Sequence, residues 1–596
     1  MQQRGPFGLA RASWRPAIRR PMARGLLTAT LGLAALCATS LSAQAQTASQ
    51  VTPGDFQPRL QRLSGSVVFS GQPGLVAPQG ADRLSVTIRD VAVENARPAL
   101  DAATQALRAR LTGRPVAVSE IFAAAAALEA AYVDAGFVLT RVVLPAQSLR
   151  NGGTLKLVVV DGFVERIDTS AAPERIRPRL DRLTADLVGK RGLTLAELER
   201  RLLLAGDTFG VALGSALSTG QMPGGTVIIL DPTYRGVTGF VGFDNSGSGA
   251  LGSVTLDAGV EANGLLGMGE VLYLRGSGYP GEISGDNGLF SGSPRLRSLA
   301  AGAVVPLNAD GLAFNLEATD SRSSPDTPGT DTKSVFQRVS ARVYYPVVRS
   351  RDRNLTTQLS MDIQRDRFDA LAPGGTVSIY EDRNTVLRLA TDGFQQLRNG
   401  FTELGVTLSL GVDALGARSA SEAARIGVPL SRAGSDASFT KAELRGRLRY
   451  GFTDAMFATL SARAQLSFGE ALPTSEQIGI AKAYELSSFD EGAISGDSGF
   501  VVRAEVARRY DTAFRTMPVT VQPYAFAALG AVHRESPAPG EAGTVRASSY
   551  GVGVDAFLST DKDFSGASLR MEVASGSRND GENDGFHFSI IGSYRF

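Results

Sequence analysis

One stretch in the C-terminal third of the chain carries a charged residue at every second position. In a β-strand, alternate side chains point to opposite faces, so these charges would share one face and the apolar residues between them the other. A row of charges is costly to bury in a dry core, whereas a water-filled channel tolerates it. We therefore predict a lumen-lining row, with an ordinary solvated sheet face as the alternative. Its members are Lys441, Glu443, Arg445, Arg447 and Arg449.

Residue types that enzymes use for covalent or metal chemistry are scarce in this sequence. Cys37 is the only cysteine and lies in the leading segment, and the two histidines are His533 and His587. A cysteine nucleophile and a cysteine metal site are thereby excluded from the rest of the chain. The acidic stretch at residues 580–585 lacks the twelve-residue loop of a calcium site. We predict no enzymatic activity, no catalytic residue, no metal site and no cofactor.

The first 45 residues have the pattern of a signal peptide. Six arginines are interspersed before an apolar stretch at residues 25–41, and Ala43, Gln44 and Ala45 form a small-x-small cleavage site. Removal of this segment takes away six arginines and no acid, which changes the net charge from +2 to −4. Nucleic-acid-binding proteins need cations to neutralise phosphates, so a mildly acidic chain argues against a nucleic-acid partner. We predict an exported protein.

The C-terminal half repeats a two-residue alternation of apolar and polar residues. At the end of the chain, Phe586, Ile590 and Phe596 belong to an apolar series that alternates with mostly polar residues. Similar alternations occur at residues 355–363 and 403–413. Segments of about ten residues with this pattern are typical of transmembrane β-barrels, whose strands have one face toward lipid and one toward the lumen.

The connections between these candidate strands alternate in length. Those at residues 281–294 and 470–498 are long and polar, whereas the one at residues 308–310 is short. Bacterial outer-membrane barrels have long surface loops and short periplasmic turns. We therefore predict a β-rich membrane protein with a sixteen-stranded antiparallel transmembrane β-barrel over residues 236–596. The sixth surface loop would span about residues 469–498, and the N-terminal part would lie in the periplasm.

Two similar units precede the predicted barrel. Residues 84–162 and residues 163–233 each follow the order strand, helix, helix, strand, strand. Two consecutive copies of one pattern indicate two modules rather than one domain. Residues 46–83 are rich in Gln, Ser, Pro and Gly, which predicts a linker, with a short helix near residues 56–63 that could act as an N-terminal plug.

Residues 132–147 of the first module contain regularly spaced aromatic, glycine and proline residues. They match the pattern Y-x-x-x-G-[YF]-x-x-[ST]-x-x-x-[LI]-P-x-Q. This pattern resembles the first periplasmic (POTRA) domain of the two-partner secretion transporters (TpsB type), the ShlB/FhaC/HecB haemolysin secretion/activation family. Residues 243–248 and 263–270 resemble the first barrel hairpin and the next turn of that family. The resemblance implies two βααββ POTRA domains before the barrel and membership of the superfamily that includes the outer-membrane barrel-assembly proteins.

The resemblance also implies roles for residues at the two ends of the molecule. An aromatic C-terminus, here Tyr594 and Phe596, is implied to be a recognition signal for barrel assembly. A substrate-recognition region is implied in the first POTRA domain, where it would include Gly136, Phe137, Arg141, Pro145 and Gln147.

The sixth surface loop matches the family in part and departs from it at its tip. Family members carry Val-Arg-Gly-[Phe/Tyr] in this loop, which folds back into the barrel, and the arginine pairs with an aspartate on a later strand. Here the tetrapeptide has serine at the arginine and glycine positions, and Ala528 occupies the position of the aspartate. The joint absence of both partners indicates an altered lock. The implied loop residues are Leu486, Ser487, Ser488, Phe489, Gly496, Asp497, Gly499, Arg503 and Glu505.

The resemblance implies an outer-membrane translocator of a Gram-negative bacterium with its POTRA domains in the periplasm. It would secrete, or secrete and activate, a large partner exoprotein (TpsA type), such as a haemolysin or a haemagglutinin-like adhesin, by two-partner (type Vb) secretion. The partner would add as a strand to the small domains. The lipid bilayer and the barrel-assembly machinery are the other expected partners. Two alternatives stay open: an assembly and insertion factor of the same superfamily, and a passive porin or uptake channel.

Overall fold

The computed structural model describes residues 46–58, 76–281, 283–327, 331–372, 375–559, 563–582 and 585–596. The predicted signal peptide lies outside these residues, as does most of the helix expected near residues 56–63. Residues 56–58 are not helical, and the short helix of this segment is instead α2 (Ala48–Val51). Among the described residues, no helix combines the length and apolarity needed to span a membrane.

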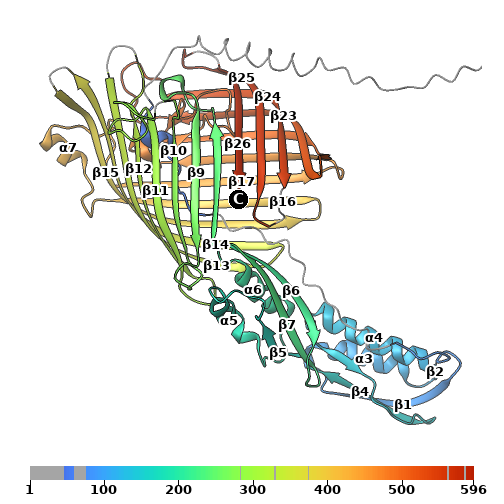
Figure 1. Cartoon of the computed structure of the whole chain (residues 1–596). Helices are drawn as coiled ribbons and strands as arrows, with labels where there is room; N and C mark the ends of the chain where they lie inside the picture. The colour runs from blue at the N-terminus through green and yellow to red at the C-terminus, as the bar shows by residue number, and fades with distance from the viewer. Residues whose placement is uncertain are drawn as a thin grey trace, which may run out of the picture. The chain divides into compact units, whose positions relative to one another are not determined.

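In the described part of the chain, sixteen antiparallel strands close into a barrel when β21 and β22, which are separated only by Arg509, are counted as one (Figure 1). The barrel closes where the last strand, β26, pairs with the first, β8. The predicted sixteen-stranded fold is thereby confirmed. The strands are β8 (Val237–Asp244), β9 (Thr255–Asn263), β10 (Val271–Gly278), β11 (Leu296–Pro306), β12 (Ala313–Ser323), β13 (Asp331–Arg349), β14 (Arg353–Ala372), β15 (Gly375–Leu397), β16 (Gly400–Val412), β17 (Phe439–Gly451), β18 (Met456–Leu466), β21 (Ser498–Arg508), β22 (Tyr510–Phe514), β23 (Met517–His533), β24 (Thr544–Ser559), β25 (Gly566–Arg578) and β26 (Gly585–Arg595).

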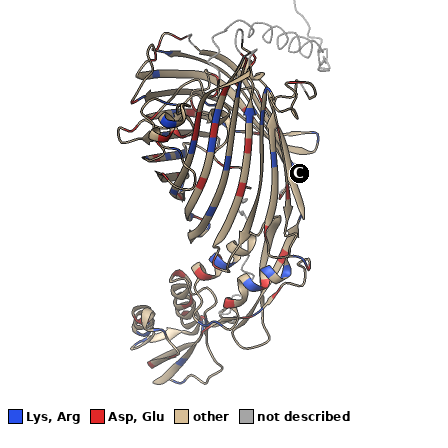
Figure 2. Cartoon of the chain, turned by 90° about the vertical axis from the view of Figure 1, so that its left-hand side faces the viewer, with Lys and Arg blue, Asp and Glu red and all other residues tan. Residues whose placement is uncertain are grey.

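The two-residue alternation separates a lipid face from a lumen face on these strands. On the outside, large apolar side chains are left open, with Leu444 49%, Leu404 55% and Phe586 64% exposed. Charged residues also run along the strands (Figure 2). In β17 they occupy the positions between the exposed apolar residues, so they belong to the lumen face. An apolar outer face around a polar interior is what a barrel in a bilayer requires.

The connections differ in length as the strand pattern predicts. Residues 398–399 and 515–516 form two-residue turns at one end of the barrel, whereas the fifth loop at the other end holds α7 (Ala420–Ile426). The sixth loop, residues 467–497, contains η4 (Thr474–Glu476) and two short strands that pair with each other, β19 (Ile478–Gly479) and β20 (Ser495–Gly496).

The first POTRA module has a four-stranded sheet in the order β2-β1-β4-β3. Ile88, Ile121 and Leu157 belong to its buried core. The predicted order of strand, helix, helix, strand, strand missed the three-residue strand β2, and the strand that it places after the second helix is short, with only three residues in β3. Gly136, with φ of 92°, ends the preceding helix and starts a turn in place of the first part of that strand. The elements are β1 (Ser85–Glu94), η1 (Pro98–Leu100), α3 (Asp101–Leu111), β2 (Pro115–Ala117), α4 (Val118–Asp134), β3 (Arg141–Val143) and β4 (Gly153–Val160).

The second POTRA module has a three-stranded sheet in the order β5-β7-β6. Ile176, Leu198 and Ile228 are fully buried in its core. Val138 and Leu139, which follow α4 of the first module, belong to the same cluster, so the two modules share packed surface. The elements are β5 (Phe163–Asp168), α5 (Arg177–Thr184), η2 (Ala185–Leu187), α6 (Leu195–Gly206), β6 (Val211–Thr219) and β7 (Gly225–Tyr234).

Candidate functional site

The sixth loop folds into the barrel and packs against the inner wall. Leu486 is fully buried at the loop tip, and Phe489 beside it is 7% exposed. These residues share a buried cluster with wall residues of β23, β24 and β25. Gly576 and Gly585 are paired across β25 and β26, and a Cβ on either glycine would collide with Ser488 or Phe489. The two glycines thus leave a bare patch of wall on which the loop tip lies.

The tip serine takes the place of the missing loop arginine in a polar network. Arg503 of β21 donates from Nη1 to the Ser487 hydroxyl oxygen over 2.9 Å, and the hydroxyl in turn donates to the Glu572 carboxylate. Arg503 and the hydroxyl of Tyr524 also donate to Glu572, the latter over 2.7 Å. Ala528 lies opposite Arg503 in the strand register. The guanidinium therefore comes from the wall, where the family resemblance implied that it comes from the loop.

Glu572 was not among the residues predicted from the sequence. It is fully buried on β25, 85 positions along the chain from Ser487. Its own neighbours in the sequence carry no motif, so no local signal identifies it. Arg503 also pairs with Glu505, Nε to Oε1, over 2.7 Å, which accounts for the spacing of these two residues on one face of β21.

Asp497 holds the base of the sixth loop. Its carboxylate accepts from the backbone N–H of Leu472 over 3.0 Å and of Glu535 over 2.8 Å, and from the Gln477 side chain over 3.0 Å. One buried carboxylate at the end of the sixth loop therefore holds Leu472 and Gln477 from the first part of that loop. It also holds Glu535 from the seventh loop, which connects β23 and β24. Gly496 and Gly499 flank this point, and a Cβ on either would collide with the backbone of β23.

The predicted lumen row divides into a covered and an open part. Lys441 is buried beneath the sixth loop, where Nζ lies 2.9 Å from Glu476 Oε2. Arg445 pairs with Asp392 of β15, and both side chains are about half exposed. Further along β17, the guanidinium carbons of Arg447 and Arg449 lie over aromatic rings. Glu443 lies in the same row, opposite Gln465 of β18.

The described N-terminal segment also lies along the lumen wall. Ala48 at the start of α2 is fully buried, and its N–H donates to the Ser334 hydroxyl of β13 over 3.1 Å. Further on, Phe56 N–H donates to Glu317 over 3.1 Å, and Arg338 donates to the Pro53 carbonyl over 3.1 Å. Two separate stretches of chain, this segment and the sixth loop, therefore occupy the lumen together.

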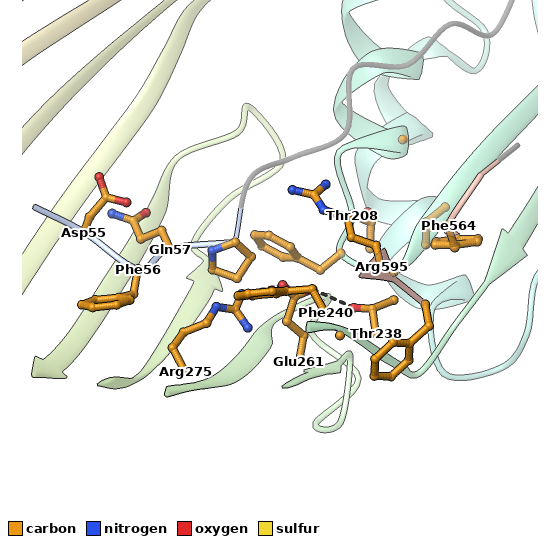
Figure 3. A pocket seen from close by; sticks show the side chains of 17 residues that line it. Asp55, Phe56, Gln57, Thr208, Thr238, Phe240, Glu261, Arg275, Phe564 and Arg595 are labelled. Carbon is orange, nitrogen blue, oxygen red and sulfur yellow. Dashed lines mark hydrogen bonds and ion pairs between the residues drawn. The ribbon is translucent and has the colours of Figure 1, made fainter. Parts of the chain in front are cut away.

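A cavity lies at the barrel end where β8 begins, beside residues 55–58 of the N-terminal segment (Figure 3). Phe56 and Phe240 contribute rings to it, and Arg275 pairs with Glu261 at 2.5 Å on its wall. Phe596 at the chain end also lines the cavity, as do residues 206 and 208–211, from the last residue of α6 to the first of β6. The cavity therefore marks the periplasmic opening of the lumen.

The sequence-predicted recognition residues of the first POTRA module lie in internal contacts. The Gly136 carbonyl accepts from Leu195 N–H of the second module over 2.7 Å, and the Phe137 ring lies 4.7 Å from the guanidinium carbon of Arg97. Gln147 exchanges two hydrogen bonds with the backbone of Lys156. The remaining residues of this set lie nearby. Arg141 begins β3 and Pro145 accepts from the Gln147 side chain.

The C-terminal aromatic residues close the barrel and face outward. Phe596 exchanges two backbone hydrogen bonds of 3.0 Å with Gly239 of β8. These bonds lie next to the Arg595–Phe240 pair, the last pair between β26 and β8. Its ring is stacked with that of Tyr594 at a centroid distance of 6.2 Å, and both side chains are more than 40% exposed. Across the described residues there is no cluster of three or more His, Cys, Asp or Glu side chains suited to a metal ion.

Two loop carboxyls have shifted pKa values with different causes. Burial alone would raise the pKa of Glu476, but Arg388 and Lys441 outweigh it and hold this pKa far below its ordinary value. Burial raises the pKa of Glu491 to about 7, and nearby Lys482 only partly opposes this effect. The first carboxyl is therefore ionised near neutral pH, whereas the second titrates there.

Comparison with known proteins places these features in a family. Residues 224–556 match the model of the haemolysin secretion/activation protein family ShlB/FhaC/HecB, and residues 86–162 match the ShlB-type POTRA domain. The outer membrane transporter CdiB of Escherichia coli is 24% identical over 543 residues, covering 87% of each chain.

Two solved structures have the same fold. That of CdiB from Escherichia coli superposes with a TM-score of 0.63 at 20% identity, covering 98% of this chain and all of the other. That of CdiB from Acinetobacter baumannii gives 0.56 at 15% identity, covering 96% and 97%. With the barrel, the POTRA modules and the family match over more than half of its length, this chain belongs to the ShlB/FhaC/HecB family, the outer-membrane transporters of two-partner secretion.

Proposed function

We propose that this protein exports one large partner exoprotein across the outer membrane by two-partner secretion. The observation that carries the proposal is a lumen occupied by two segments of the chain itself, both held by side-chain contacts with the wall. Non-covalent contacts of this kind can be exchanged for contacts with a passing polypeptide. The partner would be a secreted protein of TpsA type, such as a haemolysin or an adhesin.

The periplasmic modules would receive the partner before it enters the barrel. An extended segment that pairs with a sheet edge gains main-chain hydrogen bonds without a strict sequence requirement. The recognition set Gly136, Phe137, Arg141, Pro145 and Gln147 would then act by shaping the module and its junction with the next one. The cavity beside Phe596 would form part of the entrance to the lumen (Figure 3).

Inside the barrel, the charged row would keep the path hydrated. Arg445, Arg447 and Arg449 lie on the lumen face beyond the part covered by the loop. A hydrated wall offers no extended apolar surface for an unfolded chain to adhere to. We expect folding of the partner outside the cell to supply the free energy for its export.

Co-expression in a Gram-negative host tests the proposal. A candidate large exoprotein, chosen from the genes that neighbour this one, is expressed with the full-length transporter, with a variant lacking residues 84–232, or alone. We expect the exoprotein in the medium only with the full-length chain. Absence of export, together with loss of other outer-membrane proteins when the chain is depleted from its native host, would instead identify an assembly factor. Free passage of small solutes without any export would identify a passive channel.

A further inference from the structure

The sixth loop and the wall that faces it carry opposite charges. Residues 467–497 contain six acidic side chains and a single basic one, Lys482. The wall presents Arg388 of β15, Lys441 of β17 and Arg463 of β18 to this loop. The acids of the loop are Glu470, Glu476, Glu485, Asp490, Glu491 and Asp497.

Glu476 occupies a receptacle built from side chains of the wall. Arg388 donates two hydrogen bonds to its carboxylate, of 2.6 and 3.0 Å, and Gln364 donates a third over 3.0 Å. Lys441 Nζ lies 2.9 Å from the carboxylate and also donates to the Glu476 carbonyl over 2.8 Å, while Gln465 donates to that carbonyl over 3.1 Å. The carboxylate and the carbonyl are thus held from four different strands, and the Glu476 side chain is 1% exposed.

The wall residues around Glu476 have a net charge that one carboxylate balances. Asp362 accepts from Arg388 Nε over 2.7 Å and neutralises one of the two wall cations. Without the loop, the group Asp362, Arg388 and Lys441 would keep one unbalanced positive charge. Burying an ion pair removes water from both charges. Removal of one partner is strongly unfavourable, because the other charge is then buried without compensation.

Glu485 forms a second pair of the same polarity nearer the loop tip. Arg463 donates from Nε over 2.8 Å and from Nη2 over 2.7 Å, one bond to each oxygen of the Glu485 carboxylate. Both side chains are less than one-fifth exposed. Two-point geometry between a guanidinium and a carboxylate is the strongest form of such a contact.

We infer that the sixth loop is locked in the lumen by its own carboxylates, Glu476 and Glu485, against cations of the barrel wall, Arg388, Lys441 and Arg463. The polarity is the reverse of a lock in which the loop supplies the cation. Ser487 and Phe489 then seat the tip, while the two glutamates supply the electrostatic hold. The inference rests on the proposed function, since release of this loop would open the export path.

Single-channel recording of the full chain in a planar lipid bilayer tests the lock. Glu476→Gln removes the charge and keeps the shape, and we expect the fraction of time spent in open states to rise about tenfold or more, because one buried ion pair is lost. Glu470→Gln is the matched control in the same loop, since Glu470 is exposed and touches no wall cation among the described residues. Equal open fractions in the two variants would overturn the assignment of Glu476.

A charge exchange tests the polarity. Arg463→Glu and Glu485→Arg should each raise the open fraction, and the double variant should return most of the way to the parent value, because the attraction is restored. A double variant as open as either single one would overturn the assignment. Heat-modifiable gel mobility checks that each barrel is folded. Export of the exoprotein is scored separately, so loss of export in the parent would contradict the proposed function while the currents still decide the lock.

Discussion

At the scale of single residues, the loop tip shows how one substitution can be balanced by its surroundings. Ser487 is small and neutral, yet it stands between Arg503 and Glu572, which already form an ion pair in the wall. Ala528 opposite Arg503 adds no charge. An arginine at the tip would therefore lie beside the Arg503 guanidinium and would have to compete for Glu572, a carboxylate that Arg503 already pairs with.

Ser487→Arg is expected to release the loop tip. The new guanidinium would lie beside Arg503 in a buried place, at a cost of about 3–5 kcal/mol if it stayed unpaired. The channel should open more often in bilayer recordings, and adding Ala528→Asp should restore closure by supplying a carboxylate. Ser488→Ala is the control, because the Ser488 hydroxyl has no hydrogen-bond partner within the described residues. An effect of Ser488→Ala as large as that of Ser487→Arg would contradict this account.

Glu491 should make closure of the pore depend on pH. Its pKa is about 7 with the loop inside, where burial is the main cause and Asp244, Glu485 and Asp257 add to it against Lys482. In a released loop this pKa returns to about 4.3. Between about pH 4.3 and about pH 7, Glu491 is protonated with the loop inside and ionised when the loop is released. The free energy of closure therefore weakens as pH rises from about 4 to about 7, and it changes little above about pH 7.

Conductance of the parent and of Glu491→Gln, recorded from pH 5 to pH 8, checks this prediction. The parent should be more closed at pH 5 than at pH 8, and the variant should lose most of that difference, since glutamine stays neutral throughout. The ion pair of Glu476 does not titrate in this window because its pKa is strongly lowered. An unchanged pH response in Glu491→Gln would assign the response to another group, such as the Asp490 carboxyl, whose pKa burial also raises.

At the scale of elements, local signals set the ends of the helices in the POTRA modules. Thr194 caps α6, because its side chain accepts from Glu197 N–H while Glu197 accepts from Thr194 N–H in return. Leu198, Leu202 and Leu204 of α6 then pack into the core of the second module. The same helix lies beside the barrel, where Arg200 donates to the Pro346 carbonyl of β13 over 2.9 Å.

Thr194→Ala is expected to destabilise the start of α6 by about 1 kcal/mol, the usual value of an N-cap. Hydrogen exchange of the first turn of α6 in the full chain should then become about fivefold faster. Thr194→Ser keeps the capping oxygen and should exchange nearly as slowly as the parent. Equal acceleration in both variants would show that the methyl group of Thr194, and not the cap, stabilises this turn.

At the scale of the whole molecule, the final residue joins the two ends of the barrel. Phe596 pairs with Gly239 through its backbone, while its ring faces outward. The backbone contact serves closure of the barrel, and we predict that the exposed ring is the part that the assembly machinery recognises. The two roles separate experimentally, because a substitution changes the ring and leaves the backbone pairing in place.

Phe596→Ala is expected to lower the amount of folded barrel in the outer membrane several-fold while leaving refolding of the purified chain in detergent unchanged. Phe586→Ala near the start of β26 also removes an outward-facing ring and is the control. Membrane fractions and heat-modifiable mobility measure the two quantities. A matching loss in detergent would assign Phe596 to the stability of the barrel and remove its role as an assembly signal.

The sequence by itself determined the architecture, because barrel strands and module helices follow short periods that residues within one segment display. The alternation around Leu444 and the unequal connections predicted the sixteen strands and their two faces. Short elements such as β2 were not predicted, because three residues are too few to display the two-residue alternation of a strand.

Only the tertiary structure decided which lumen residues meet. Glu476 contacts Arg388, 88 positions away, and Ser487 contacts Glu572, 85 positions away. A polar residue on a lumen-facing position has the same local pattern whether it touches water, the loop or another strand. Lys441 illustrates this, because the alternation assigned it to the lumen, and only the inward fold of the sixth loop assigned it to the carboxylate of Glu476. The closure of the barrel and the path of the loop create these pairings, and neither is encoded within one segment.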